Sequence, residues 1–380
     1  MQKIIIILVT LMLFTSISQA QDLKQDAMNT YADIVFASYE DSLSLAEDLQ
    51  TAINAFLANP SEDSLSLART MWLLANEPYG QTEVYRFYGG PIDDEDGPEG
   101  LLNAWPLDEA YVDYVEGAPE VGIINNADEF PTIDKDLLLS LNEVGAEENI
   151  STGYHAIEFL LWGQDLSADT NGQRPYTDYT TAANAERRGA YLAAAAELLV
   201  EHLGTLVEAW DPAVSGNYRE SFLALEPDDA INNMLTGMGV LAKSELAGER
   251  IFTAFDNQDQ EDEHSCFSDN THRDIVTNFK GIENVYLGRY VRLNGQIVNG
   301  VGLEAVVAEA DAGLNASMLE LLAQADTATV NLAAPFDQAI VTAEGRPQVM
   351  NLVTTLLDLG DTIAEVGTGL GLTINTALPE

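Results

Sequence analysis

The sequence predicts an all-α fold of two tandem helical bundles, and three observations support this prediction. Apolar residues recur every three or four positions through most of the 380 residues, which is the spacing of helices that bury one face. Runs that alternate between apolar and polar residues, which indicate strands, are few. No period of about 20–50 residues repeats, so a solenoid is excluded. With 46% hydrophobic residues, the chain can bury the core of one large or two medium domains.

The predicted elements follow from this periodicity along the chain. We expect helices at 22–59, 61–78, 134–142, 149–163, 179–210, 228–255, 270–286, 303–326 and 344–371, and a loop rich in glycine, proline and acidic residues at 89–106. The turn-rich segment 167–180 separates a predicted N-terminal domain, 21–166, from a C-terminal bundle, 181–380. Ser167 and Asp178 stand where a calcium loop needs its first acid and its final glutamate, so we expect no calcium at 167–178.

The first twenty residues have the features of a secretory signal peptide. Lys3 provides a basic start, the run from Ile4 to Phe14 is almost wholly apolar, and Ser18-Gln19-Ala20 is a small-residue cleavage site. We therefore expect cleavage after residue 20 and a protein located in the periplasm or outer cell envelope. The single cysteine, Cys266, lies far from this site, which argues against a lipid anchor there and excludes an internal disulfide.

The charge of the chain is strongly acidic, with a formal net charge of −46 at pH 7. Such a charge argues against binding to nucleic acid and against charge-driven binding to anionic membranes. Acidic residues on solvated faces also keep a protein soluble, and adaptation to a saline habitat explains them more simply than a charge-based function does. No segment of the mature chain is apolar over enough length to predict a transmembrane span.

The segment from Gly153 to Gly163 is apolar except for one imidazole and one carboxylate. In a helix, His155 and Glu158 lie three residues apart and share a face, and the apolar neighbours predict that the helix is buried. A buried pair of this kind must be hydrogen-bonded, ion-paired or bound to a metal. A satisfied pair in the core and a ligand site or active site are both open at this point.

The motifs of metallopeptidases are absent from the sequence, since no His-Glu-x-x-His occurs and Phe159 stands where the inverted motif needs a histidine. A third metal ligand beside His155 and Glu158 could come from either half of the chain: Glu83, Asp113, Asp269 or His272. One imidazole with several carboxylates is a ligand set that suits iron. Cys266 is only weakly supported as a nucleophile, and a small buried apolar residue is the favoured interpretation.

Four segments together resemble the imelysin family of secreted bacterial proteins. The Gly-x-His-x-x-Glu signature of the family is matched by Gly153, His155 and Glu158 and continues to Asp165. The other three segments are Ala68–Trp72 with Tyr79–Glu83, Trp105–Asp108 with Asp113-Tyr114, and Glu263–His272. The four segments occur in the family's order and cover nearly the whole mature chain.

This resemblance implies a periplasmic or outer-envelope protein of two helical-bundle domains with the signature near their interface. It implies His155 and Glu158 as metal ligands and Glu83 as their acidic partner. Trp105, Asp113, Asp269, His272 and Cys266 are expected as neighbours of the site. The metal would be iron, bound as an ion or within an iron-containing ligand, and components of iron uptake in the envelope would be partners.

Two functions remain open on the sequence. The first is a non-catalytic protein of iron uptake that binds iron through these residues. The second is a metallopeptidase of the insulin-cleaving imelysin class, in which zinc would replace iron and Glu158 would ligate the metal or act as general base. The missing zinc motifs favour the first function.

Overall fold

A computed structural model describes the backbone of residues 2–379 and the side chains of residues 21–379. The all-α prediction is confirmed, because helices follow one another along the chain and the described strands form a single small hairpin. The predicted signal peptide, residues 1–20, falls outside the part of the chain whose side chains are described. Its removal stays a prediction.

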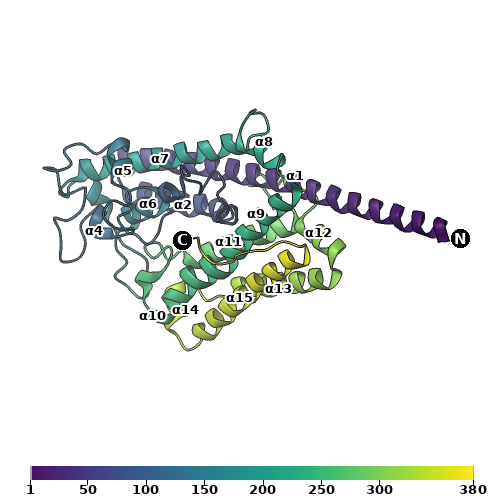
Figure 1. Cartoon of the computed structure of the whole chain (residues 1–380). Helices are drawn as coiled ribbons and strands as arrows, with labels where there is room; N and C mark the ends of the chain where they lie inside the picture. Colours follow the sequence, from purple (N-terminus) through teal and green to yellow (C-terminus); the bar gives the residue numbers. More distant parts are fainter. Residues whose placement is uncertain (1, 380) are drawn as a thin grey trace.

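The first layer consists of four helices: α1 (Gln2–Ala58), α2 (Glu62–Gly80), α6 (Gly153–Trp162) and α7 (Ala185–Trp210). Ser61 begins α2 as predicted, since its hydroxyl accepts from the amide of Ser64 while the Ser64 hydroxyl accepts from the amide of Ser61. α7 runs alongside α1, and α2 packs on both α1 and α6 (Figure 1). This layer therefore fixes the helix that carries the His-x-x-Glu pair.

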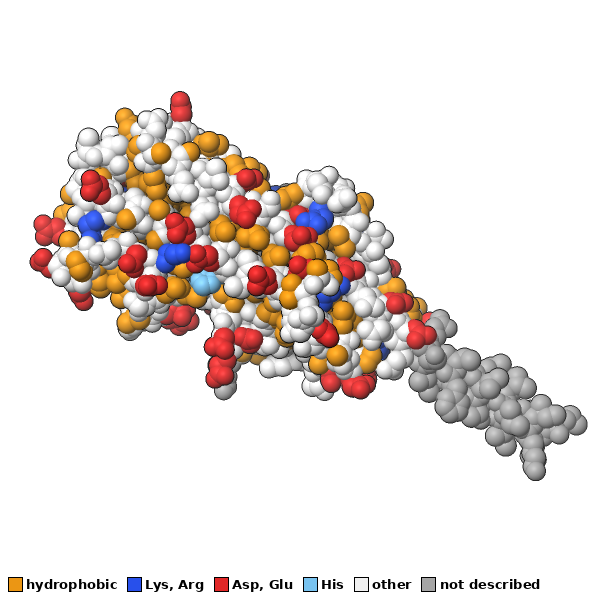
Figure 2. All heavy atoms as spheres, turned by 90° about the horizontal axis from the view of Figure 1, so that it is seen from above, with side chains coloured by type: hydrophobic (Ala, Val, Ile, Leu, Met, Phe, Trp, Pro, Cys, Tyr) orange, Lys and Arg blue, Asp and Glu red, His pale blue; other side chains and the backbone are white. Residues whose placement is uncertain are grey.

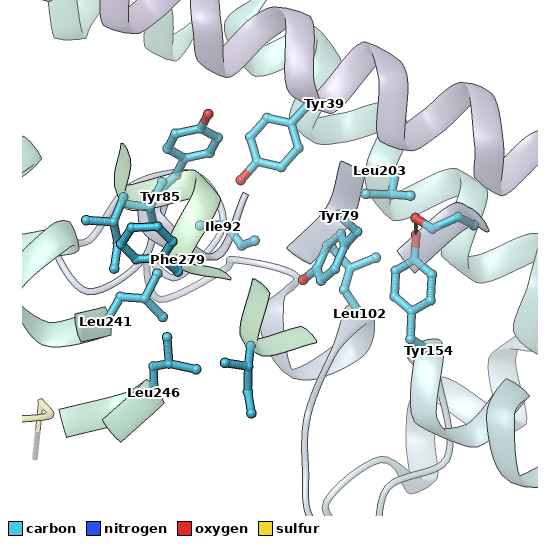
Figure 3. Packing of buried hydrophobic residues seen from close by; sticks show 14 of the residues in the cluster. Tyr39, Tyr79, Tyr85, Ile92, Leu102, Tyr154, Leu203, Leu241, Leu246 and Phe279 are labelled. Carbon is cyan, nitrogen blue, oxygen red and sulfur yellow. Dashed lines mark hydrogen bonds between the residues drawn. The ribbon is translucent and has the colours of Figure 1, made fainter. Parts of the chain in front are cut away.

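Short elements connect α2 to α6 and α6 to α7. They are η1 (Glu83–Tyr85), α3 (Glu99–Leu102), α4 (Glu109–Val112), α5 (Lys135–Leu141) and, after α6, η2 (Tyr176–Tyr179). The predicted loop at 89–106 thus contains one helical turn, α3, and the predicted linker at 167–180 contains η2. Buried aromatic side chains pack α2 against α6 within the first layer. Tyr79 of α2 lies beside Tyr154 of α6, with ring centroids 4.8 Å apart (Figure 3).

The second layer follows α7. Its elements are α8 (Tyr218–Leu223), α9 (Pro227–Val240), η3 (Leu241–Phe252), α10 (Thr253–Asn257), η4 (Gln260–Asp262), α11 (Thr271–Leu287), α12 (Leu303–Ala310), α13 (Ala312–Val330), α14 (Phe336–Val341) and α15 (Gly345–Gly369). The predicted helix at 228–255 is therefore interrupted by a π-helical segment, η3. α15 packs against η3, α13 and α9 (Figure 1).

A β-hairpin that the periodicity does not predict joins α11 to α12. Its strands, β1 (Arg289–Val291) and β2 (Ile297–Asn299), pair antiparallel across a turn at Asn294-Gly295. Gly295 has a φ of +81°, which suits a residue without a Cβ. Arg292, next to β1, ties the hairpin to α1 through Asp41, at 2.7 Å.

The longest helix contacts both predicted domains. α1 packs on α2 and α7, and it also contacts α9 and α12 of the segment predicted as a C-terminal bundle. Buried residues form one cluster that runs from Ala27 to Val366. The division at 167–180 into two bundles stays a prediction.

The surface and the apolar helices bear on the membrane prediction. Figure 2 shows acidic side chains spread over one face with few lysines and arginines among them. In the part of the chain with described side chains, α7 is the one helix whose length and hydropathy would allow it to cross a membrane. Half of its most apolar stretch is buried within the protein, and it packs on α1, α5 and α6, as a core helix does.

Candidate functional site

The start of α6 depends on one glycine. Gly153 has a φ of +83°, in the left-handed region, and a Cβ built there would lie 2.5 Å from the carbonyl oxygen of Leu102. Only glycine meets both demands without strain. All ten residues of α6 are buried, so its two polar side chains, His155 and Glu158, are enclosed in the core.

Replacing Gly153 by alanine is expected to lower the free energy of unfolding by about 2 kcal/mol or more, because strain and a backbone clash add. The matched control is Gly204→Ala in the last third of α7, where a Cβ meets nothing within 4 Å. That control is expected to stabilise the protein by about 0.5–1 kcal/mol. Urea unfolding of both variants measures the difference, and equal stabilities would contradict the role of Gly153.

His155 and Glu158 contact each other as their spacing predicts. Nδ1 of His155 lies 3.0 Å from Oε2 of Glu158. The other oxygen, Oε1, accepts from the amide and the hydroxyl of Ser268, at 2.9 and 2.6 Å. Burial raises the pKa of Glu158, while the bonds from His155 and Ser268 oppose that rise. These contacts orient the imidazole so that its Nε2 faces away from the carboxylate.

A second histidine, His264, is held in the same way. Its Nδ1 lies 2.9 Å from Oδ2 of Asp274 in the first turn of α11. The same oxygen accepts from the hydroxyl of Ser265 at 2.6 Å, and Oδ1 accepts from the amide nitrogens of Asn76 and Asn270, at 2.7 and 3.1 Å. Asp274 is thus a buried carboxylate with its acceptor sites filled, and it fixes the ring of His264.

The two imidazoles pack against each other edge to face. The ring centroids of His155 and His264 are 4.6 Å apart and the planes are nearly perpendicular, at 86°. Both side chains are buried, and Nε2 of each ring has no hydrogen-bond partner among the described residues. Burial, then the charge of Arg250 and the neighbouring His155, lower the pKa of His264 well below its ordinary value. His264 is therefore neutral at pH 7, and its Nε2 keeps a free lone pair.

Glu83 lies with arginines rather than in the histidine pair. Its Oε2 accepts from Arg250 at 2.6 Å and from Arg86 at 2.8 Å, and Oε1 accepts from the amide of Asn103 at 3.3 Å. Burial would raise the pKa of Glu83, but the guanidinium groups of Arg250 and Arg86 override it and lower the pKa to about 2. The carboxylate of Glu83 is thus engaged in ion pairs with these two arginines.

Asp113 lies in a separate ion cluster. Its Oδ2 accepts from Arg174 and Arg188, each at 2.6 Å, and its Oδ1 accepts from Arg188 at 2.9 Å. These contacts join the connection after α4 to the start of α7. The structure therefore does not bring Asp113 to the histidine pair as a ligand.

The remaining predicted neighbours lie around the segment that precedes α11. The indole of Trp105 is 5.7 Å from the ring of His264, and its N–H donates to the carbonyl of Glu263 at 2.8 Å. His272 Nδ1 lies 3.1 Å from the carbonyl of Asp269. Burial and nearby carboxylates, Glu158 first, raise the pKa of the Cys266 thiol, so it is protonated at pH 7 and unsuited to act as a nucleophile.

His264 and Asp274 are the site residues that reasoning from the sequence missed. His264 occurs in one of the four segments quoted above, but its partner Asp274 is ten residues further along, which no helical spacing relates. Over residues 21–379 no group of three or more His, Cys, Asp or Glu side chains is arranged to hold a metal ion. The protein therefore offers two imidazole nitrogens, each oriented by a carboxylate.

Comparison with known proteins shows which family the chain belongs to. The sequence model of imelysin matches residues 35–363, which is most of the chain. The chain belongs to the imelysin family. Among curated proteins, the chain is 24% identical over 361 residues to "Iron-regulated protein A" of Synechococcus elongatus, and the match covers 92% of this chain and 88% of that protein.

Two solved structures share the fold of this chain. One is described as a putative iron-regulated protein A precursor from Parabacteroides distasonis, with a TM-score of 0.71 and 19% identity, covering 92% of this chain and 95% of the other. The second is an imelysin-like protein from Psychrobacter arcticum, with a TM-score of 0.65 and 13% identity, covering 93% and 98%. At these identities the likeness concerns the fold alone.

Proposed function

We propose that this protein binds a metal ion, iron, through Nε2 of His155 and Nε2 of His264, as part of an iron-related role in the cell envelope. The observation that carries the proposal is the pair of buried Nε2 atoms, on rings 4.6 Å apart, that have no hydrogen-bond partner among the described residues. A buried polar atom without a partner is costly unless something fills the place beside it. The choice of iron rests on the names of the similar proteins.

The donor set fits a metal in two respects. Histidines that bind metals usually give their other ring nitrogen to a carboxylate, and Glu158 and Asp274 accept those bonds here. Two imidazoles that share one ion at about 2.1 Å have ring centroids about 4.5–5.3 Å apart, and the observed 4.6 Å falls in that range. The bound ion would accept electron pairs from both rings, and its other positions would be filled by water or by atoms of a ligand.

The site proposed from the sequence changes in two respects. His155 remains a ligand and Glu158 becomes the carboxylate that orients it, while His264 takes the place of Glu83. Because two arginines bind Glu83, its carboxylate balances their charge. A hydrolytic zinc site needs about three protein ligands and an open position, so nothing in this geometry favours the peptidase alternative.

Calorimetric titration of residues 21–380 with Fe(II), in the absence of oxygen, tests the proposal. We expect about one ion per chain, a loss of affinity of at least about 100-fold in His155→Ala and in His264→Ala, and a loss of about 10–100-fold in Glu158→Gln. Zn(II) is expected to bind more tightly than Fe(II) in vitro, as it does to most nitrogen sites. His202→Ala on α7 is the control, and circular dichroism checks folding.

Two results would overturn the proposal. One is the absence of binding by Fe(II) or Zn(II) to the folded wild-type protein. The other is an affinity in His155→Ala and His264→Ala equal to that of His202→Ala, because a site that neither ring affects cannot be the histidine pair.

A further inference from the structure

A cavity of about 300 Å³ lies beside the histidine pair without including it. Trp105, which contacts His264 on one side, lines the cavity on another, together with Arg86 and Arg250 of the ion cluster around Glu83. The remaining wall comes from α3 and the connection to α4, from the segment after α5, from η3 and from the C-terminal tail. The proposed metal site does not use this space.

The wall of the cavity carries an excess of negative charge. Arg86 and Arg250 are already paired with Glu83, Glu99 and Glu245, at distances of 2.6–3.9 Å. Three further glutamates in the lining form no salt bridge within the part of the chain that the structure describes: Glu143, Glu147 and Glu249. An occupant with a positive charge is therefore favoured over a neutral or anionic one.

Two of the lining residues each carry a buried atom that lacks a hydrogen-bond partner within the described residues. The side chain of Asn103 is 4% exposed, and since its Nδ2 donates to Glu83, its Oδ1 is the free acceptor. The Nε of Arg86 is a donor without a partner. An occupant that offers one N–H and one acceptor oxygen would satisfy both atoms, and buried polar atoms are costly when left unsatisfied.

The apolar part of the lining also limits the occupant. The only donor of Trp105 is already bound to the carbonyl of Glu263, so its ring offers an aromatic surface alone. Leu378 lines the cavity from the C-terminal tail. Ser244 and Asn232 hold that tail by donating to the carbonyls of Thr376 and Thr373, at 2.6 and 3.1 Å. An ammonium group beside an aromatic surface gains further attraction from the ring.

We propose that this cavity binds a small organic ammonium ion that carries a neighbouring carbonyl oxygen, as an amino-acid amide or the amino terminus of a peptide does. The ammonium group would lie among the three unpaired glutamates and donate to Oδ1 of Asn103. The carbonyl oxygen would accept from Nε of Arg86, and an aliphatic side chain would contact Trp105 and Leu378. A volume of about 300 Å³ holds roughly ten water-sized groups, which is the size of such an amide.

Titration of residues 21–380 with three matched compounds tests this chemistry. Leucinamide has both groups, isoamylamine lacks the carbonyl, and N-acetyl-leucinamide lacks the charge. We expect isoamylamine and N-acetyl-leucinamide each to bind at least about 10-fold more weakly than leucinamide, since each loses a charged hydrogen bond. Equal affinities for all three, or no binding of leucinamide, would overturn the proposal.

Variants separate this cavity from the general acidity of the protein. The triple variant Glu143→Gln/Glu147→Gln/Glu249→Gln changes exposed residues and is expected to bind leucinamide about 10-fold more weakly. Glu208→Gln/Glu309→Gln/Glu365→Gln removes the same charge elsewhere on the surface and should leave binding unchanged. An equal loss in both triple variants would show unspecific attraction and reject the site.

Two further comparisons identify the class of ligand and separate the cavity from the proposed metal site. Binding of leucylglycinamide as well as leucinamide would assign the cavity to peptide amino termini, whereas binding of leucinamide alone would assign it to small amino-acid amides. His264→Ala is expected to retain leucinamide binding, because the ring of His264 does not line the cavity. The outcome for this cavity is therefore independent of the outcome for the metal.

Discussion

Replacement of Glu83 by glutamine is expected to lower the free energy of unfolding by about 3–5 kcal/mol. The variant leaves Arg250, whose side chain is 3% exposed, without its closest carboxylate, and removes the 2.8 Å pair with Arg86. Glutamine has nearly the same shape, so the lost charge rather than a cavity causes the effect. A double variant, Glu83→Gln/Arg250→Met, is expected to be more stable than the single variant because it also removes the buried guanidinium that has lost its closest carboxylate.

The same carboxylate predicts a dependence on pH. The arginines lower the pKa of Glu83 to about 2 against the burial that would raise it, while in the unfolded chain its pKa is near 4.5. A lowered folded-state pKa gives stability that is complete above about pH 4.5 and is lost as the pH falls toward 2. The contribution is about 3 kcal/mol. Over this range Glu83→Gln should lose less stability than the wild type.

Urea unfolding at pH 7 and at pH 3 measures both effects. Glu95→Gln, in the exposed acidic loop, is the control and should match the wild type at both values. A Glu83→Gln variant as stable as the wild type at pH 7 would show that the ion cluster contributes nothing to folding.

Replacement of Asp113 by asparagine is expected to destabilise the fold by a similar amount, about 3–5 kcal/mol. Asp113 is fully buried between Arg174 and Arg188, which make three hydrogen bonds of 2.6–2.9 Å to it. Asparagine keeps the shape but offers one acceptor oxygen and no charge to two buried guanidinium groups. Among the described residues, Asp178 is then the one carboxylate that still pairs with either arginine, at 3.2 Å from Arg174.

The measurement is again urea unfolding at pH 7, with Asp128→Asn on the exposed surface as the control. Measuring the affinity for Fe(II) distinguishes this structural role of Asp113 from a role in the proposed metal site. Since Asp113 does not contact the histidine pair, Asp113→Asn should bind Fe(II) as the wild type does wherever it remains folded. A strong loss of iron binding in the folded variant would return Asp113 to the site.

Periodicity predicts the helices of this fold well where their apolar faces are long. The helices at 22–59 and 179–210 appear as α1 and α7, with α1 starting earlier and α7 starting six residues later than predicted. Periodicity does not predict the hairpin β1–β2, because its strands are three residues long and too short to show alternation. Periodicity also does not distinguish the π-helical η3 from an α-helix, because the apolar face continues through the local change of hydrogen bonding.

The site is predictable only where its partners are close in the sequence. His155 and Glu158 share one helix, so their spacing alone predicts the contact that the structure shows at 3.0 Å. His264 meets His155 because the segment before α11 packs on α6, which is a long-range contact that no local pattern encodes. Glu83 is predicted as an acidic partner from its match to the family segment. That match could not reveal that Arg250, 167 residues away in the sequence, binds its carboxylate.

The position of Trp105 has an optical consequence. The protein has four tryptophans, and three of them, Trp72, Trp162 and Trp210, are at most 2% exposed. Trp105 is partly exposed, contacts the ring of His264 and lines the acidic cavity. Its indole emission is therefore the component open to a neutral quencher such as acrylamide. The protein thus carries a fluorescent reporter between its two proposed binding sites, without any added label.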